Sequence, residues 1–167
     1  MTIETAVFLF FPALIIFAGA MDIFTMTIPN RVPLALIAGF ACLAPFAGLS
    51  LEAIAIHVAV GVAMLVVGIG MFAAGWMGGG DAKLLAAVAM WMGLEHVYEY
   101  ALLSAVCGGL ITLAFLFLRR FPLPEKIAAQ QWVSRLHDAG KGVPYGVALA
   151  AGGLFVYPNI GWIQQLH

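Results

Sequence analysis

The sequence predicts an all-α, polytopic membrane protein, and three observations lead to that prediction. Of the 167 residues, 64% are hydrophobic and only 9% are charged, and the mean hydropathy is +1.07. A soluble domain carries about 25% charged residues, so this chain has too little polar surface to cover a globule in water, and lipid must be its solvent. The apolar residues form long runs, and the basic residues are confined to a few of the breaks between them. The length predicts a single domain, residues 1–167.

Six apolar runs are candidates for membrane-spanning helices, which need about 20 residues each. The expected spans are 6–21, 33–50, 54–74, 83–97, 100–118 and 143–163. Pro12 lies inside the first run, where its ring is expected to kink the helix. The fourth run is short, and we expect it to be tilted or buried by its neighbours.

Lys and Arg fall on one side of these six spans. The loops 22–32, 75–82 and 119–142 share that side, which takes all seven basic residues: Arg31, Lys83, Arg119, Arg120, Lys126, Arg135 and Lys141. The other side holds both termini and the loops near 51–53 and 95–99, and its charged residues are Glu4, Glu52, Glu95 and Glu99. Because basic residues favour the cytoplasmic side, we predict that both termini lie outside the cytoplasm.

The long loop 119–142 is the one polar segment of appreciable length. Read as a helix, it places an apolar set on one face: Ala128, Ala129, Trp132, Val133 and Leu136. Such a pattern is typical of an amphipathic helix that lies at a membrane interface. We therefore expect this loop to anchor on the membrane surface.

Two aspartates stand out among the few side chains that can run a reaction. Asp22 ends the first apolar run and is followed by further apolar residues, and Asp81 follows the glycines 78–80 at the start of the fourth run. An ionisable group at membrane depth is energetically expensive and suggests function by default. Each also has a simpler interpretation: Asp22 as an interfacial carboxylate that reaches water, and Asp81 as a helix N-cap.

Considered as a pair, Asp22 and Asp81 predict peptide hydrolysis. The topology places both on the same face at similar depth, as a shared site requires. Two carboxylates held close together cannot both ionise easily, so one keeps a proton and the two titrate as a unit. The ionised member can take a proton from water while the protonated member donates to the scissile carbonyl oxygen. The glycines before Asp81 could admit an extended peptide, or could simply form a flexible turn.

No other chemistry is predicted. Cys42 and Cys107 lie in apolar runs without a C-x-x-C pair, which argues against a zinc or redox site. The histidines are scattered at His57, His96, His137 and His167, and no serine has a neighbouring base. We expect neither a metal nor a cofactor, and a net charge of -1 gives no reason to expect a nucleic-acid partner.

Two further functions fit a membrane protein with two aspartates. A transporter or proton-conducting protein could use paired carboxylates as a relay. A relay needs ionisable groups staggered through the membrane, however, and His57 alone lies in mid-span. In a structural subunit of a secretion assembly, the aspartates would only cap helices.

Three segments carry a resemblance to a known family. Gly78-Gly79-Gly80-Asp81, followed by Lys83-Leu84, resembles the G-x-G-D-x-K-L motif of type IV prepilin peptidases. Asp22 with Ile28-Pro29-Asn30 is similar to that family's D…IPN segment, and residues 141–148 look like the start of its last span. The closest type is the short, CpaA/TadV-like form of Tad/Flp pilus systems, and the resemblance covers nearly the whole chain.

The resemblance implies a bacterial inner-membrane aspartic protease that cuts the short basic leader from prepilins or pseudopilins, on the cytoplasmic side, just before the pilin's apolar helix. It implies that Asp22 and Asp81 are catalytic. Gly78, Gly80 and Lys83 would be motif residues, with Lys83 tuning Asp81 or holding the loop. Pro29 and Asn30 would shape the turn and cap the second span. Larger family members also N-methylate the pilin and carry a cysteine-rich insertion, which this chain lacks after its first span, so methylation is not expected.

Overall fold

The computed structural model describes residues 3–164, and these residues form helices and no β-strand. The predicted all-α class is confirmed. The elements are α1 (Ile3–Thr25), α2 (Arg31–Phe46), α3 (Leu51–Ala73), α4 (Gly79–Leu118), α5 (Glu125–Ala128), α6 (Gln131–His137), the 3-10 helix η1 (Ala139–Lys141), α7 (Tyr145–Val156), the 3-10 helix η2 (Tyr157–Asn159) and α8 (Gly161–Gln164).

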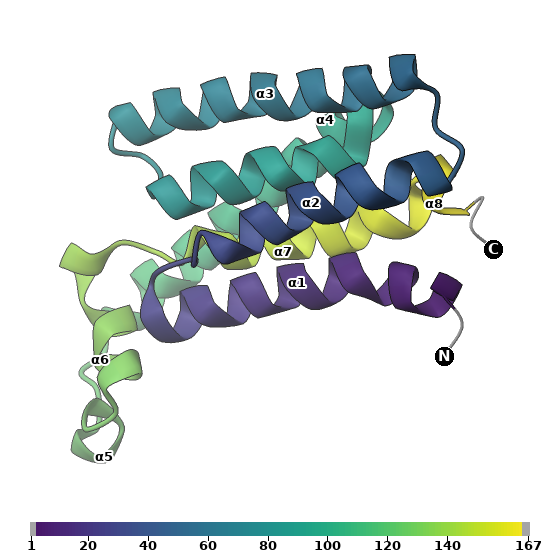
Figure 1. Ribbon diagram of the computed structural model, residues 1–167. Coiled ribbons are helices and arrows are strands. Elements are labelled where there is room, and N and C mark those ends of the chain that lie inside the picture. Colours follow the sequence, from purple (N-terminus) through teal and green to yellow (C-terminus); the bar gives the residue numbers. More distant parts are fainter. Residues whose placement is uncertain (1–2, 165–167) are drawn as a thin grey trace.

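The long helices lie side by side and form a bundle (Figure 1). α7 packs against both α1 and α4, while α2 packs against α1 and α4. α3 packs extensively on α4 alone and forms the outermost layer (Figure 1). α5 and α6 extend beyond the bundle at one end. α1 begins at the other end, and α8 also ends there.

Three helices are long and apolar enough to cross a membrane: α1 over Phe8–Thr25, α3 over Leu51–Ala73 and α4 over Gly79–Leu118. α2 is apolar but shorter, over Arg31–Phe46. These helices agree with a polytopic membrane protein. They also cover the first three predicted spans, with ends that differ by a few residues.

The fourth and fifth predicted spans form one interrupted helix, α4. A straight helix of 40 residues would measure about 60 Å, twice the roughly 30 Å of membrane hydrocarbon. Gly93, with φ +64°, breaks it into two halves, 79–92 and 94–118. The second half of α4 turns back toward the start of the first half, as shown by Thr112 and Asp81, which line the same pocket. The predicted loop near 95–99 is therefore wrong: those residues are helical and the turn is at Gly93. The first half is buried by its neighbours, as expected.

The last predicted span, 143–163, is also interrupted. α7 ends at Val156, after 12 residues. Pro158 lies in η2, and because proline has no backbone N–H, it cannot donate the hydrogen bond that would continue an α-helix. The short helix α8 follows. The termini, which the sequence places outside the cytoplasm, fall partly on residues 1–2 and 165–167, and these lie outside the described residues.

An aromatic cluster holds the half of the bundle farther from α5 and α6. Trp91 is fully buried in the first half of α4, 4.9 Å from the ring of Phe11 and 5.5 Å from that of Trp162. Its indole N–H donates to the carbonyl of Leu36 at 3.0 Å. Tyr157 stacks on Phe11 at 4.6 Å. This cluster joins α1, α2, α4, η2 and α8, and it fixes the helices whose opposite ends carry the aspartates.

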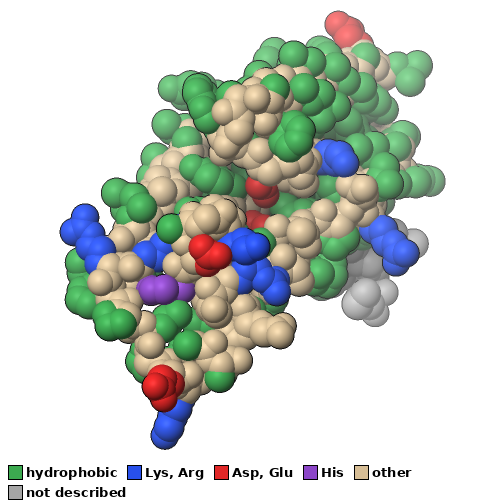
Figure 2. Space-filling view, turned by 90° about the vertical axis from the view of Figure 1, so that its left-hand side faces the viewer, with side chains coloured by type: hydrophobic (Ala, Val, Ile, Leu, Met, Phe, Trp, Pro, Cys, Tyr) green, Lys and Arg blue, Asp and Glu red, His purple; other side chains and the backbone are tan. Residues whose placement is uncertain are grey.

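The basic residues gather at the end of the bundle that carries α5 and α6. Figure 2 views that end directly and shows Lys and Arg atoms around a hollow with acidic atoms in it. The loops 26–30, 74–78 and 119–144 also meet there (Figure 1). The seven basic residues and the two aspartates thus belong to one end of the molecule.

The loop 119–142 does not form the single interfacial helix that was expected. It contains two short helices, α5 and α6, so the proposed apolar face is divided between them. Trp132 of α6 packs on Phe24 of α1, with ring centroids 5.2 Å apart, and Leu136 is buried. Arg119 donates to the carbonyl of Leu136 at 2.7 Å. α6 therefore packs on the end of the helix bundle through Leu136 and Trp132, while the ring of Trp132 is still 36% exposed. Anchoring of this loop on the membrane surface stays a prediction.

Candidate active site

Asp22 lies in the last turn of α1 and is only 4% exposed. The N–H of Gly146, in the first turn of α7, donates to Oδ2 of Asp22 at 2.7 Å. The first N–H groups of a helix have no partner within it and carry a partial positive charge. The carboxylate of Asp22 in α1 thus lies against the N-terminus of α7, a helix far from it in the sequence. α1 ends three residues later, where Met26 has a positive φ of 54°.

Asp81 lies in the first turn of α4 and is 8% exposed. Its Oδ2 accepts the N–H of Gly78 at 3.2 Å, the N–H just before its own helix. The N-cap of α4 is therefore Gly78 rather than Asp81, and Asp81 contributes to the capping from the third helical position by accepting the N–H of Gly78. Capping engages one oxygen of each aspartate, and among the described residues Oδ1 of neither one accepts a hydrogen bond. One oxygen of each carboxyl group is left for substrate or water.

The three segments that drew attention in the sequence meet at Ile28. This side chain is 8% exposed in the loop after α1. A Cβ at Gly80 would lie 3.3 Å from Cβ of Ile28, and one at Gly146 would lie 2.7 Å from its Cδ1. Both glycines therefore allow backbone to approach this residue closely. Ile28 fixes the loop of Asp22 against the segments that carry Asp81 and Gly146.

Lys83 and Asn30 form a second connection between the two aspartate segments. Nζ of Lys83 donates to Oδ1 of Asn30 at 2.9 Å. Lys83 therefore holds the loop, and it forms no ion pair with Asp81 in the described part of the chain. Asn30 occupies the N-cap position of α2, as predicted, but its side chain makes no capping hydrogen bond. Pro29 does shape the turn, since its carbonyl accepts the N–H of Val32 at 3.0 Å.

Both aspartates line the same two pockets. One, of about 410 Å³, extends toward Trp76, Thr112 and Lys141. The other, of about 270 Å³, extends toward Ile28, Asn30 and the glycines 78–80. The two share four residues: Asp22, Met26, Gly78 and Asp81. Open space thus lies on both sides of the carboxylate pair, as a chain that passes across it would need.

The charge in this site is concentrated on the two aspartates. Lys141 is the one basic residue that lines the larger pocket. Within the described residues no ion pair involves Asp22 or Asp81, and no group of three or more metal-ligating side chains is present. Two carboxyl groups that line one open pocket are the groups that acid-base hydrolysis without a side-chain nucleophile requires.

Of the residues that the sequence analysis singled out, Asp22, Asp81, Gly78, Gly80 and Asn30 line the two aspartate pockets, and Lys83 is joined to them by its hydrogen bond to Asn30. Ile28 and Gly146 lay in the quoted segments but were given no role, and Met26 was missed. Gly146 lay in a segment that had been singled out, but nothing in its spacing showed that its N–H would bind Asp22. Met26 could not be found, because a positive φ at a non-glycine residue leaves no signal in the sequence.

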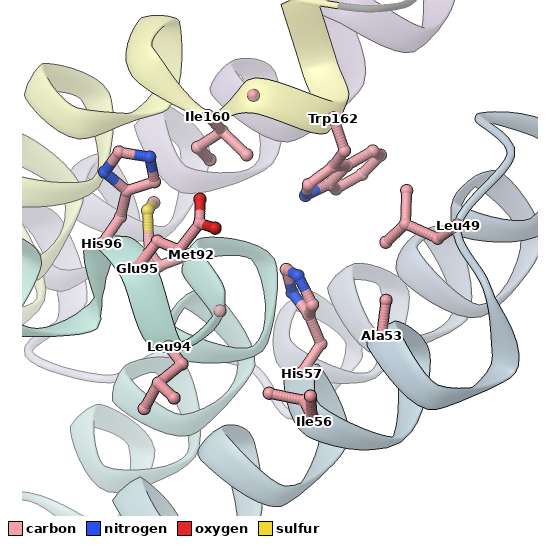
Figure 3. A pocket seen from close by; sticks show the side chains of 12 residues that line it. Leu49, Ala53, Ile56, His57, Met92, Leu94, Glu95, His96, Ile160 and Trp162 are labelled. Carbon is pink, nitrogen blue, oxygen red and sulfur yellow. The ribbon is translucent and has the colours of Figure 1, made fainter.

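A cavity of about 370 Å³ lies at the opposite end of the bundle (Figure 3). His57 from α3, Glu95 and His96 from α4, and Trp162 from α8 line it. Nδ1 of His57 lies 2.7 Å from the carbonyl of Met90, to which it donates. Glu95 is exposed, so this cavity contains no buried acid.

Comparison with known proteins gives one match. A sequence profile described as the type IV leader peptidase family matches residues 9–113, well over half of the chain. The matched range contains Asp22, Asn30, Asp81 and Lys83, and it ends before the segment that carries Gly146. No match was found among curated proteins or among solved structures.

Proposed function

Because the chain belongs to the type IV leader peptidase family, we propose that it is an aspartic endopeptidase embedded in the membrane, with Asp22 and Asp81 as its catalytic pair. The observation that carries this proposal is the placement of the pair. Two buried carboxyl groups from separate helices line the same two pockets, and each has one oxygen without a hydrogen-bond partner in the described chain. In a structural subunit, no open space between the two groups would be needed.

In the proposed reaction, one aspartate is ionised and the other is protonated. The ionised carboxylate takes a proton from water, and the resulting oxygen attacks the scissile carbonyl carbon. The protonated carboxyl group donates its proton to the carbonyl oxygen, and the gem-diol that forms is neutral. Its collapse breaks the C–N bond, with a proton passing to the amine. The helix N-termini at Gly146 and Gly78 favour negative charge on the carboxylates.

The substrates that we propose are prepilins of the Tad/Flp type, because the chain resembles the short, CpaA/TadV-like members of the family. The site faces the cytoplasm of the inner membrane in this proposal, with both chain ends on the periplasmic side. This orientation follows from the seven basic residues at the aspartate end and the acidic residues Glu52, Glu95 and Glu99 toward the other. The leader would therefore be removed on the cytoplasmic face.

Cleavage without methylation is part of the proposal. The loop after α1 spans only residues 26–30 and holds no cysteine. Cys42 and Cys107 lie in α2 and α4 and remain free thiols. Nothing in the described chain corresponds to the cysteine-rich insertion of the larger members.

A proton relay is a weaker proposal for this site. It would have to connect Asp81 with His57, which lie near opposite ends of the first half of α4. The side chains between them are buried and apolar: Leu84, Leu85, Ala87, Val88 and Trp91. No polar path through the described residues joins the two groups.

The test is co-expression with a candidate prepilin, with leader loss read by mass spectrometry. Asp22→Asn and Asp81→Asn are each expected to abolish cleavage while the protein still accumulates in the membrane. Asp138→Asn is the matched control, because Asp138 lies at the same end and also accepts a backbone N–H, from Gly140 at 2.9 Å, but is exposed. Full cleavage by either site variant would refute the catalytic pair.

A further inference from the structure

An apolar groove lies beside the candidate active site. α2 supplies Pro33, Leu34 and Ile37 to its wall, α3 supplies Leu65, and Ala86 of α4 forms its floor. Its volume is about 310 Å³. Leu34 is 63% exposed, so the groove is not filled by the protein's own side chains.

The groove opens sideways because α2 and α3 stand apart beside Leu34 and Leu65. The two helices meet nearer the other end of the bundle, where Phe40 of α2 stacks on His57 of α3 with ring centroids 5.3 Å apart. Both pack on α4, and α3 approaches it closely at Gly68, where a Cβ would lie 3.0 Å from that of Ala82. At the groove, α2 and α3 thus lie over a common floor formed by α4 (Figure 1). In a membrane, such an opening faces the acyl chains.

The polar end of the groove leads to the aspartates. Asn30 and Lys83 line this end, and their hydrogen bond lies at the junction. Asn30 also lines the smaller of the two aspartate pockets, which in turn shares both aspartates with the larger one. The groove is therefore adjacent to the smaller aspartate pocket, with Asn30 lining both, and the two aspartate pockets adjoin each other at the carboxyl groups.

We propose that this groove receives the first turns of the substrate's apolar helix, so that the scissile bond reaches Asp22 and Asp81 from the side of α2 and α3. The inference rests on the proposed function and adds the docking surface. The substrate chain would unwind beyond Asn30 and cross the aspartates. Its leader would then enter the larger pocket, near Trp76 and Lys141.

The dimensions suit a short helical contact. Leu34 and Ile37 lie four and seven residues beyond Asn30, which corresponds to roughly 6 and 10 Å along a helix axis. The groove thus covers about two turns of a packed helix. A lipid acyl chain could occupy the same apolar space, but it would make no use of the aspartate pocket that adjoins the groove at Asn30. A helical substrate with an extended leader uses both.

The first experiment is photo-crosslinking in cells that co-express a prepilin. A benzophenone amino acid replaces Leu34 in the Asp81→Asn variant, which would retain uncut substrate. The control carries the same probe at Leu110, which is also 63% exposed but lies on the second half of α4, outside the groove. We expect a prepilin adduct from position 34 and none from position 110. Adducts of equal yield at both positions, or lipid adducts alone at position 34, would overturn the proposal.

The second experiment fills the groove. Leu34→Trp is expected to raise KM for a prepilin that contains its helix by about tenfold or more, equivalent to about 1.4 kcal/mol of binding. The loss on a leader peptide that ends shortly after the cut site should be much smaller. Leu110→Trp should leave both rates as in the parent protein. An equal loss on both substrates would sink the docking surface.

Failure of the proposed function gives a different result. If Asp81→Asn still removes the leader, the catalytic pair is wrong, whatever position 34 binds. If the aspartate variants are inactive and Leu34→Trp cleaves the full prepilin normally, the pair stands and only the groove is wrong.

Discussion

The two ends of the helix bundle contain cavities of similar size and different chemistry. The pocket at the basic end, about 410 Å³, contains two buried carboxyl groups, whereas the cavity at the opposite end, about 370 Å³, has His57 against a backbone carbonyl and an exposed Glu95 (Figure 3). The volumes of the two cavities therefore do not show which of them is a reaction site. The burial of ionisable groups separates them, because a membrane protein keeps a buried carboxyl group only at considerable free-energy cost.

Glycines also serve different purposes at the two ends. Near the aspartates, Gly146 and Gly80 let backbone approach Ile28 and the carboxyl group of Asp22. At the far end, Gly93 provides a positive φ and leaves room for the ring of His57, which a Cβ would approach to 2.5 Å. Gly146 and Gly80 help to position the carboxyl groups, whereas Gly93 allows α4 to turn. Substitutions at the two ends should therefore affect different measured quantities.

Among the substitutions that compare the two ends, the largest effect is expected from lengthening Asp22. Asp22→Glu keeps the charge but adds a methylene group, so the carboxylate cannot keep its place on the Gly146 N–H. A misplacement of about 1 Å can lower a rate by about 100-fold. Cleavage of purified prepilin in detergent measures this rate. Glu95→Gln at the far end is the comparison, and a loss there as large as that of Asp22→Glu would remove the distinction between the two ends.

The next effect should appear in stability. Gly93→Ala forces a residue with a side chain into φ +64° against His57, which we expect to lower the free energy of unfolding by about 2 kcal/mol. Cleavage per folded molecule should stay near the parent value. Thermal unfolding in detergent measures the change in stability. The cleavage rate normalised to folded protein measures the activity per folded molecule. Unchanged stability would mean that the turn at Gly93 is not required.

Gly146→Ala should show the reverse pattern. The new Cβ would lie 2.8 Å from Oδ2 of Asp22, so the carboxylate must move, and we expect roughly a tenfold loss of rate. The new Cβ would also lie 2.7 Å from Cδ1 of Ile28, and the cost of moving that side chain is offset in part by the better helix propensity of alanine, so stability should fall less than in Gly93→Ala. Gly109→Ala is the control, because a Cβ there meets nothing within 4 Å. Equal rates for the two variants would contradict the role of Gly146.

The smallest effect is expected at the link between the two aspartate segments. Lys83→Met removes the hydrogen bond to Asn30, and since both side chains are exposed, the loss should be about 0.5–1 kcal/mol, or roughly threefold in rate. Asn30→Ala should reproduce it, and the double variant should lose no more than either single one. Additive losses would show that Lys83 acts elsewhere.

Prediction from sequence succeeded where the signal is local. Composition identified the membrane helices, and the G-x-G-D and D…IPN segments identified the residues of the site. It failed where one segment meets another. Asn30 occupies the N-cap position of α2, but its side chain accepts from Lys83, and the turn expected near 95–99 lies at Gly93. The loop 119–142 was expected to form one interfacial helix but holds two short ones, and Trp132 of α6 packs on Phe24 of α1.

The sequence by itself determined that this chain is a bundle of apolar helices, which end carries its basic residues, and which two aspartates lie there. Those properties follow from composition, run length and charge order along the chain. Only the tertiary structure decided that both carboxyl groups line shared pockets, that the N–H of Gly146 binds Asp22, and that an apolar groove adjoins one of these pockets at Asn30. Each of these depends on backbone distances between segments remote in sequence, which packing sets and no local pattern encodes.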